Sequence, residues 1–533
     1  MADLDIPALL AALPPRLAGI VQAHAAARPA APALRDPHAG TVDYAALWQG
    51  IQDCAAHLRA LGVRPGDRVM AVGENCANLV TLIFAAGLLD AWIVNVNARL
   101  SPREVDALQA HSGARLVFYT AEVSPDARAH GKRHGATDAA GPFGPWLVGP
   151  LNQDCVPQPV HADNATQPAA LVYTTGTTGQ PKGVLLSHRG LAYVAAVSSR
   201  LRGLTPADRA YGALPTSHVY GLASVMLGTL YAGACLVLAP RFTAPGLLQA
   251  LDEERLTILQ GVPAMFARLL ELTGAAAPLP NRLRFAYAGG SPLTPSLKAA
   301  AERLLGVALH NGYGMTESGP TISQTDLAAP RADTSVGRPI PGVELRVVDG
   351  AGAGADVTPG QPGQLWVRGP GLMLGYYRDP AQTAAALRPG GWLDTGDMGR
   401  QDADGSLFIV GRSKELIIRS GFNVYPLEVE TVLNAHPAVA QSAVVGRACA
   451  DGNEEVIAYV EPDARAECAD LARVLAAYAA QALAPYKCPS RIIVMEALPA
   501  AATGKILKGR LAQMAAQLGS VPIGERSRGF EGA

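Results

Sequence analysis

The sequence predicts an α/β protein: a large N-terminal domain of layered sheets and helices with a β-rich subdomain, followed by a small α+β C-terminal domain. Three observations support this fold class. The chain has 533 residues, more than one hydrophobic core normally holds. Strand-like and helix-like segments alternate through roughly the first 400 residues, which is typical of parallel sheets covered by helices. After Ser335 the pattern becomes rich in half-buried strands.

The alternation is clearest near the N-terminus. Residues 44–61 have the periodicity of an amphipathic helix, and residues 67–72 form the short apolar run of a buried strand. A second helix and strand follow at 78–89 and 91–96. The same order of segments returns at 209–214, 220–231, 235–239, 245–254 and 263–272. We therefore expect largely parallel sheets.

Two stretches depart from this order. Residues 127–166 are rich in Gly, Pro, His and Asp and poor in periodic apolar residues, so they predict a surface loop. Residues 343–348 and 364–368 alternate like half-buried strands, and residues 350–354 between them predict a flexible hairpin tip. This glycine-rich tip does not end a strand-to-helix unit, so it is not a dinucleotide fingerprint.

We place the domain boundary at Gly411-Arg-Ser-Lys414, which gives an N-terminal domain of residues 1–411 and a C-terminal domain of residues 412–533. The segments predicted for the C-terminal domain are helices at 426–434 and 468–483 and strands at 442–446, 456–460 and 491–496.

Composition narrows the class of protein. Lys and Arg total 44 against 45 Asp and Glu, so the chain lacks the basic excess of a nucleic-acid or membrane-surface binder. No apolar run reaches the roughly 18 residues that span a bilayer. The seven cysteines show no C-x-x-C pair, which fits a reducing compartment and argues against zinc. With an acidic N-terminus unlike a signal peptide, we expect a cytoplasmic protein; its oligomeric state is left open, a homodimer included.

The most informative segment follows a strand at 170–173. Residues 174–182 contain four threonines, two glycines and Lys182. Glycines let backbone N–H groups turn toward an anion, hydroxyls add donors, and the lysine adds a positive charge. The spacing is not that of a Walker A loop. A ligand-free surface loop is the alternative, since these residues are common in loops.

Residues 174–184, Thr-Thr-Gly-Thr-Thr-Gly-Gln-Pro-Lys-Gly-Val, resemble the phosphate loop of the adenylate-forming superfamily. This group includes acyl-CoA synthetases, nonribosomal-peptide adenylation domains and luciferases. Five further motifs follow in the family's order, at 288–290, 311–317, 391–397, 411–421 and 503–505. The resemblance implies an enzyme that uses ATP and Mg²⁺ to activate a carboxylic acid as an acyl-adenylate, with CoA as the acceptor.

The resemblance also assigns roles around the nucleotide. The residues assigned to the phosphates are Thr174, Thr175, Gly176, Thr177, Thr178 and Lys182. Those assigned to the adenine side of the site are Ala288, Gly289, Asn311, Gly312, Tyr313 and Gly314. Tyr313 stacks on adenine, Thr316 bonds to the α-phosphate and Glu317 holds Mg²⁺, for which one carboxylate beside phosphate oxygens is enough. Core packing of Tyr313 and a helix-cap role for Thr316 and Glu317 are the alternatives.

The remaining roles lie further along the chain. Asp397 accepts hydrogen bonds from the ribose hydroxyls, and Arg412 is a second ribose or phosphate contact. Lys505 is the catalytic residue whose ammonium stabilises charge on the phosphorus and the leaving pyrophosphate. Lys414 marks a hinge about which the C-terminal domain is mobile, and Gly421 approaches the pantetheine arm. Turn, linker and solvent-exposed roles are the alternatives for these side chains.

The resemblance narrows the class of substrate acid but does not identify the acid. His218 resembles the family's gate beside the acyl site. Amino-acid-activating relatives carry an aspartate near this histidine, where this chain has Val219 and Tyr220. Malonate-activating relatives carry an arginine where this chain has Gly312, so a dicarboxylate is disfavoured unless a different arginine serves. An uncharged aryl or aliphatic acid is therefore expected.

Three other functions stay open at this point. A stand-alone adenylating enzyme that loads a carrier protein would keep every adenylation residue. A luciferase-like oxidation is a second alternative. A protein that merely binds nucleotide would not need Lys505, Glu317 and Asp397 together.

Overall fold

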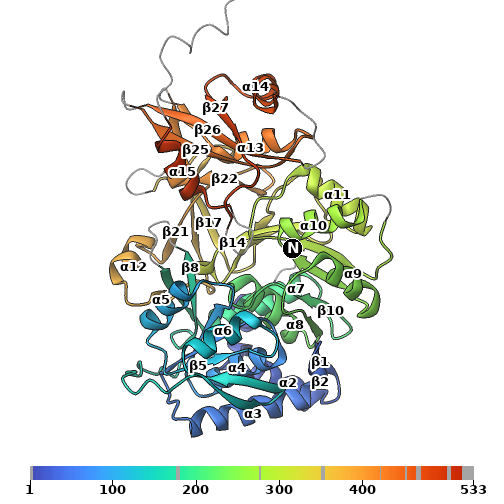
Figure 1. Cartoon of the computed structure of the whole chain (residues 1–533), viewed down its shortest axis with the longest axis vertical. Helices are drawn as coiled ribbons and strands as arrows, with labels where there is room; N and C mark the ends of the chain where they lie inside the picture. The colour runs from blue at the N-terminus through green and yellow to red at the C-terminus, as the bar shows by residue number, and fades with distance from the viewer. Residues whose placement is uncertain are drawn as a thin grey trace, which may run out of the picture. The chain divides into compact units, whose positions relative to one another are not determined.

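The computed structural model describes residues 4–175, 181–274, 278–349, 354–419, 422–449, 453–463, 470–500 and 506–518. The chain divides into two compact units (Figure 1). The larger unit comprises Met1–Arg346, Trp366–Thr395 and Asp402–Phe408. The smaller unit comprises Val347–Leu365, Gly396–Gln401 and Ile409–Ala533.

A nine-stranded sheet forms one layer of the larger unit, with the strand order β16-β15-β14-β13-β12-β10-β11-β1-β2. Its strands are β1 (Pro32–Asp36), β2 (Gly40–Asp43), β10 (Arg209–Gly212), β11 (Cys235–Leu238), β12 (Ile258–Gly261), β13 (Phe285–Ala288), β14 (Leu309–Gly314), β15 (Thr321–Gln324) and β16 (Arg338–Pro339). The strands from β1 to β14 in this order pair in parallel, and the outer pairs are antiparallel. The predicted parallel arrangement is confirmed for the centre of this sheet.

An eight-stranded sheet has the order β19-β9-β8-β4-β3-β5-β7-β6. Its strands are β3 (Arg68–Gly73), β4 (Trp92–Asn97), β5 (Leu116–Tyr119), β6 (Thr137–Gly141), β7 (Gly144–Val148), β8 (Pro168–Thr175), β9 (Pro181–Ser187) and β19 (Gly375–Tyr376). The centre, from β8 to β5, is parallel, so the carboxyl ends of β3, β4 and β8 share one edge. β8 ends at this edge, where α/β proteins bind ligands, and the predicted phosphate loop follows β8 in the sequence.

The prediction of a surface loop at residues 127–166 is wrong over the first part of this range. The chain there forms α6 (Pro125–Arg133) and a hairpin of β6 and β7 that pairs with β5. Trp146 and Leu147 are buried and anchor the hairpin to the sheet. The apolar run of this hairpin, residues 146–148, is only three residues long and follows Gly and Pro. It is too short to show the alternation that predicts a strand.

Helices cover both sheets. Those of the larger unit are α1 (Ile6–Ala12), α2 (Ala18–Ala27), α3 (Tyr44–Ala60), α4 (Ala77–Leu88), α5 (Pro102–Ser112), α7 (His188–Leu201), α8 (Gly228–Tyr231), α9 (Ala244–Glu253), α10 (Pro263–Thr273), α11 (Pro295–Leu305) and α12 (Pro380–Ala386). Figure 1 shows α9, α10 and α11 grouped beside the nine-stranded sheet. Capping explains where several begin: Asp43 accepts from the N–H of Ala46 at α3, and Ser187 accepts from that of Gly190 at α7.

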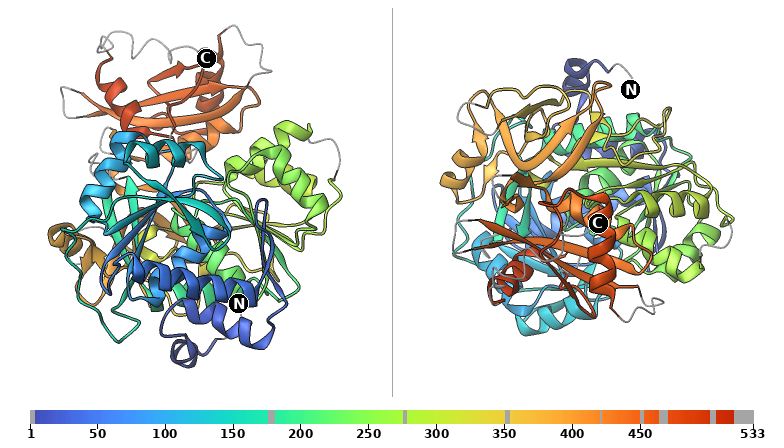
Figure 2. Two further views of the ribbon diagram at one scale, coloured as in Figure 1. Left: turned by 60° about the horizontal axis from the view of Figure 1, so that its bottom comes forward. Right: turned by 90° about the horizontal axis from the view of Figure 1, so that it is seen from above.

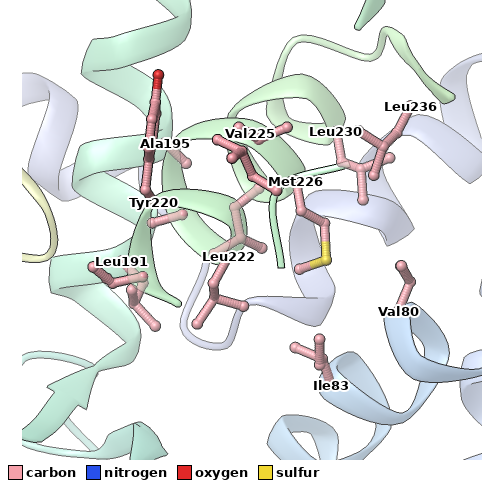
Figure 3. Packing of buried hydrophobic residues seen from close by; sticks show 14 of the residues in the cluster. Val80, Ile83, Leu191, Ala195, Tyr220, Leu222, Val225, Met226, Leu230 and Leu236 are labelled. Carbon is pink, nitrogen blue, oxygen red and sulfur yellow. The ribbon is translucent and has the colours of Figure 1, made fainter. Parts of the chain in front are cut away.

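The helix predicted at 220–231 is present, but its first part, Tyr220–Leu227, is wound as a π-helix, η1, before α8 continues it. Every residue of η1 is buried. Figure 3 shows Leu222, Val225 and Met226 of η1 with Val80 and Ile83 of α4 in one apolar cluster. This cluster also takes side chains from both large sheets, so the two sheets share one core.

The β-rich part of the chain forms a five-stranded sheet with the order β17-β18-β21-β20 and β22 paired to β21. Its strands are β17 (Glu344–Val348), β18 (Gly363–Arg368), β20 (Leu387–Arg388), β21 (Trp392–Gln401) and β22 (Leu407–Arg412). The predicted β-rich subdomain is confirmed. The predicted hairpin tip at 350–354 lies outside the described residues except for Gly354.

The C-terminal part of the smaller unit has the predicted α+β organisation. Strands β25 (Val439–Ala448), β26 (Glu454–Pro462) and β27 (Arg491–Val494) form its sheet, seen in orange and red in Figure 2. Alternate residues of β26 face opposite sides: Val456 packs with α13 (Pro426–Asn434) and α14 (Leu471–Ala482), and Ile457 packs with α15 (Lys508–Ala516). A short hairpin of β23 (Ile417–Arg419) and β24 (Phe422–Val424) precedes them. No helix of the described residues is long and apolar enough to cross a membrane.

Candidate active site

The two strands that flank the phosphate loop bring its ends together. β8 and β9 pair antiparallel, and Thr174 lies opposite Lys182 in their register. The backbone of Thr175 is opposite that of Pro181. The predicted phosphate contacts Gly176, Thr177 and Thr178 lie between these ends, outside the described residues.

Lys182 contacts Tyr376 of β19, a residue that the sequence analysis did not identify. The Nζ atom of Lys182 lies 5.1 Å from the centroid of the Tyr376 ring, within the range of a cation–π contact. β19 pairs with β9, which explains why residues about 190 positions apart meet. Tyr376 stands in no motif of its own, so no sequence signal identified it.

The hydroxyl of Tyr376 in turn donates a hydrogen bond to Glu317 Oε1 across 2.8 Å. Burial and the Glu317 carboxylate both raise the pKa of Tyr376, so the phenol stays a donor. Lys182, Tyr376 and Glu317 therefore form one chain of contacts from the phosphate loop to the predicted Mg²⁺ ligand. The second carboxylate oxygen of Glu317 has no partner among the described residues.

Thr316 and Glu317 lie in a short 3-10 turn, η2 (Thr316–Ser318), directly after β14. Ser318 Oγ donates to the carbonyl of Pro320 across 2.6 Å, and the N–H of Met373 donates to the carbonyl of Glu317 across 2.8 Å. These bonds fix the turn. Both Thr316 and Glu317 are more than nine-tenths buried, so few other conformations are open to their side chains.

The residues assigned to adenine lie where the parallel pairing of β13 and β14 ends. Ala288 of β13 is opposite Asn311 of β14, and Gly289 follows directly. Asn311 is held in place because its Nδ2 donates to the carbonyl of Thr334 at 3.0 Å and its Oδ1 accepts from the N–H of Gly312 at 3.0 Å.

Two glycines of this motif are required by close packing. A Cβ on Gly314 would lie 1.8 Å from the carbonyl oxygen of Pro320, and a Cβ on Gly312 would lie 1.8 Å from the hydroxyl of Tyr287. Tyr313 between them is half-buried and lies opposite Ser323 of β15. The glycines therefore let β14 approach its neighbours closely while Tyr313 keeps a partly exposed ring.

His218 precedes η1 and is exposed. Its Nδ1 accepts a hydrogen bond from the N–H of Tyr220 at 3.3 Å, which orients the ring and places the proton of a neutral imidazole on Nε2. The structure thus leaves the ring accessible in the segment where the sequence predicts the gate.

In the smaller unit, Asp397 of β21 and Arg412 of β22 meet as an ion pair with 3.2 Å between Oδ1 and Nε. Asp397 is buried and Arg412 is exposed, so the carboxylate is held while the guanidinium keeps access to solvent. The sequence assigned Asp397 to the ribose and Arg412 to the ribose or a phosphate, and the structure places the two side chains side by side. The predicted Gly421 and Lys505 lie outside the described residues.

Comparisons with known proteins agree with these motifs. Residues 21–377 match the family model of AMP-binding enzymes, and residues 428–505 match the model of the AMP-binding enzyme C-terminal domain. The chain is 33% identical to 4-coumarate–CoA ligase 2 of Oryza sativa subsp. japonica, covering 96% of this chain and 93% of that protein. It is 34% identical to indoleacetate–CoA ligase of Aromatoleum aromaticum, covering 93% and 98%.

Among solved structures, ATP-bound MatB of Rhodopseudomonas palustris superposes with a TM-score of 0.81 at 29% identity, covering 94% of this chain and 99% of that one. Fold, motifs and near-complete coverage of the relatives agree. The chain therefore belongs to the AMP-binding enzyme family, as an AMP-forming acid–CoA ligase.

Proposed function

We propose that this chain joins a carboxylic acid to CoA in two steps at one site. In the first step a carboxylate oxygen of the acid attacks the α-phosphorus of ATP, and the bond to the leaving pyrophosphate breaks. In the second step the CoA sulfur, having lost its proton to solvent, attacks the acyl carbonyl and AMP leaves. ATP and CoA are the co-substrates, and Mg²⁺ accompanies ATP.

The observation that carries this proposal is the chain of contacts from Lys182 through Tyr376 to Glu317. It links a cation at the phosphate loop to a buried carboxylate. A triphosphate with its metal needs a cation beside the phosphate oxygens and a carboxylate beside the metal, and Lys182 and Glu317 supply these two charges close together.

The residues present fit Mg²⁺. Glu317 offers one carboxylate oxygen while Tyr376 holds the other. Magnesium is usually bound through one or two carboxylates plus phosphate oxygens and water, so a lone glutamate suffices. No group of three or more acidic, His or Cys side chains among the described residues forms a separate metal cage. The ion would shield the charge of the leaving pyrophosphate.

Nucleotide positioning falls to the motif residues. Tyr313 stacks on adenine, with Ala288, Gly289 and Asn311 forming the edge of the base pocket. Support comes from their position where the parallel pairing of β13 and β14 ends. The hydroxyl of Thr316 donates a hydrogen bond to the α-phosphate.

The smaller compact unit, which includes Gly396–Gln401, supplies the remaining groups. Asp397 accepts from the ribose hydroxyls, and Arg412, paired with it, contacts the ribose or a phosphate. Lys505 stabilises the charge that develops on the α-phosphate. With the boundary between residues 411 and 412, the domain of residues 412–533 turns about Lys414 and brings Gly421 to the pantetheine arm in the second step.

His218 stands at the acyl site as the gate, and the free acid enters past it. We place the enzyme in the cytoplasm, which the free thiols of all described cysteines support.

The experiment is a panel of aryl, short-chain and long-chain acids incubated with ATP, Mg²⁺ and CoA. AMP, pyrophosphate and thioester are measured, with omission of each component as the control. At least one acid is expected to give AMP and thioester in equal amounts. If every acid gave adenylate that accumulates and no thioester, the chain would be an enzyme that loads a carrier protein and not a CoA ligase. No acid-dependent pyrophosphate release at all would overturn the proposal.

A further inference from the structure

A buried arginine next to the candidate site has no anionic partner among the described residues. Arg202 caps the C-terminal end of α7, and its side chain is 1% exposed. One guanidinium nitrogen, Nη1, donates to Gln260 Oε1, and the guanidinium lies over the Tyr287 ring, 4.3 Å from the centroid. Its other nitrogens, Nε and Nη2, are buried and have no hydrogen-bond partner in the described part of the chain.

Three neighbouring side chains share this condition. Gln260 Nε2 and the hydroxyls of Tyr220 and Tyr287 are also buried without a hydrogen bond of good geometry among the described residues. The Tyr287 hydroxyl lies close enough to Arg202 for the guanidinium to oppose the rise in its pKa that burial causes. Gln260 and Tyr287 are opposite each other on β12 and β13, so they point to the same face of the sheet. Burial raises the pKa of Tyr220 while the charge of Arg202 lowers it, which puts this hydroxyl within electrostatic reach of the guanidinium. We call these four residues the Arg202 cluster.

The Arg202 cluster borders the candidate site through two glycines. The Tyr287 hydroxyl lies 1.8 Å from where a Cβ on Gly312 would be, and the Tyr220 ring lies 3.4 Å from a Cβ on Gly289. Both glycines belong to the motifs assigned to the nucleotide side of the site. Tyr220 also follows the predicted gate by two residues, and Figure 3 shows its hydroxyl directed away from Leu222, on the side of Ala195.

An unpaired buried guanidinium is costly because arginine does not lose its proton in proteins. A purely structural arginine would be expected to have its donors satisfied by carbonyls or carboxylates. Here four side chains with unsatisfied donors lie close together beside the candidate site. A planar or tetrahedral oxyanion accepts two parallel bonds from a guanidinium and further bonds from hydroxyls and an amide, and so complements this donor set.

We propose that the Arg202 cluster binds an anionic group, a carboxylate or a sulfonate, at the end of the substrate acid opposite its reacting carboxyl. The inference rests on the proposed ligase function and narrows its substrate. An anionic acid then takes the place of the uncharged acid that the sequence favours. Malonate-activating relatives carry an arginine at the position of Gly312, and in this chain Arg202, at the end of α7, supplies the positive charge instead.

The test compares acids that differ only at the far end, by kcat/KM from CoA-dependent AMP release. The pairs are glutarate with pentanoate, adipate with hexanoate, terephthalate with 4-methylbenzoate, and 3-sulfopropanoate with butanoate. The unmodified enzyme is expected to prefer the anionic member of at least one pair. Arg202→Gln should lower activity on that acid by roughly 30-fold or more, the effect of removing one partner of a buried charge pair, and leave its uncharged partner within about threefold.

Arg202→Lys keeps the charge and should restore part of the preference, and Tyr287→Phe should reduce it through the loss of one donor. A thermal melt of each variant, with and without 10 mM of the preferred acid, separates binding from folding: the acid should raise the melting temperature of the unmodified protein and not that of Arg202→Gln. Activity on uncharged acids alone, or an equal loss on both members of a pair, overturns this inference and leaves the ligase function standing. Failure of every acid, in these pairs and in the wider panel, to release AMP overturns both.

The sulfonate and dicarboxylate pairs tell the two anions apart. A preference for 3-sulfopropanoate alone identifies a sulfonate, and a preference for one of the dicarboxylates alone identifies a carboxylate and the length of the acid.

Discussion

The hydroxyl of Tyr376 donates to Glu317 Oε1 across 2.8 Å, joining β19 to the turn after β14. Since Lys182 lies over the same tyrosine ring, this one side chain positions both the cation of the phosphate loop and the carboxylate assigned to Mg²⁺. It is a positioning residue, acting through Glu317.

Tyr376→Phe should therefore weaken the use of MgATP. A hydrogen bond to a charged group contributes about 1.5–3 kcal/mol, so the KM for MgATP should rise roughly tenfold or more, with a smaller change in kcat. Steady-state kinetics over a range of ATP and Mg²⁺ concentrations measures this split.

The neighbouring Tyr377 provides the matched control, because its buried hydroxyl has no hydrogen-bond partner in the described part of the chain. Tyr377→Phe should leave the KM for MgATP unchanged. Equal effects of the two substitutions would show that the Tyr376–Glu317 bond has no part in nucleotide binding.

Gly314→Ala should destabilise the larger unit. The new Cβ would lie 1.8 Å from a backbone carbonyl of Pro320, which cannot move without shifting β15. Overpacking of this kind costs about 1–3 kcal/mol, seen as a lower midpoint in urea. Gly509→Ala, in α15 with open space around its Cβ position, should be neutral or slightly stabilising. A Gly314→Ala midpoint equal to that of the unmodified protein would contradict the packing argument.

Stability should fall with pH below neutrality. Burial lowers the pKa of His188 to about 3 and that of His310 to about 4, from an ordinary value of 6.5. Both rings are neutral in the folded chain, whereas the unfolded chain binds protons on them below pH 6.5. Their contribution is complete above that pH and is lost as pH falls toward the folded values. Between pH 7 and pH 5 each should remove roughly 2 kcal/mol from the free energy of unfolding.

His188→Asn tests this prediction, since the amide can accept the bond that the N–H of Leu17 now donates to Nδ1 of His188. Urea unfolding at pH 7, 6 and 5 should show a smaller pH dependence for the variant. An unchanged dependence would mean that His188 is charged in the folded protein.

Lys505→Ala should separate the two steps. Loss of the ammonium removes a charge that acts on the α-phosphate, so acid-dependent pyrophosphate release should fall at least about 100-fold. Thioester formation from added acyl-adenylate and CoA should stay within a few-fold. Equal losses in both steps would contradict the assignment of Lys505 to adenylation alone.

Much of the fold could be predicted because its core elements carry strong periods. Residues 44–96 alternate helix and strand with regular apolar spacing, and the structure has α3, β3, α4 and β4 there within a residue or two. The hairpin of β6 and β7 was missed because edge strands need only a few buried side chains, here around Trp146. The π-helical start of the segment at 220–231 has no signature in its composition.

The site was predictable only where it lies in motifs. Thr174, Lys182, Asn311 and Glu317 stand in contiguous strings. Thr174 and Lys182 are opposite each other on β8 and β9, and Glu317 lies in the turn that follows β14, the strand of Asn311. Tyr376, Arg202, Gln260 and Tyr287 stand in no such string. Their roles depend on strand pairing and burial across long separations, which one sequence does not reveal.

The central claim is that the acid's own carboxylate attacks the α-phosphorus of ATP. An acid labelled with ¹⁸O in its reacting carboxyl, incubated with the enzyme, ATP, Mg²⁺ and CoA, tests it directly when the nucleotide product is analysed by mass spectrometry. The account predicts AMP that carries one ¹⁸O atom, formed in equal amount with thioester and unlabelled pyrophosphate. ADP together with labelled inorganic phosphate, or AMP without label, would contradict it.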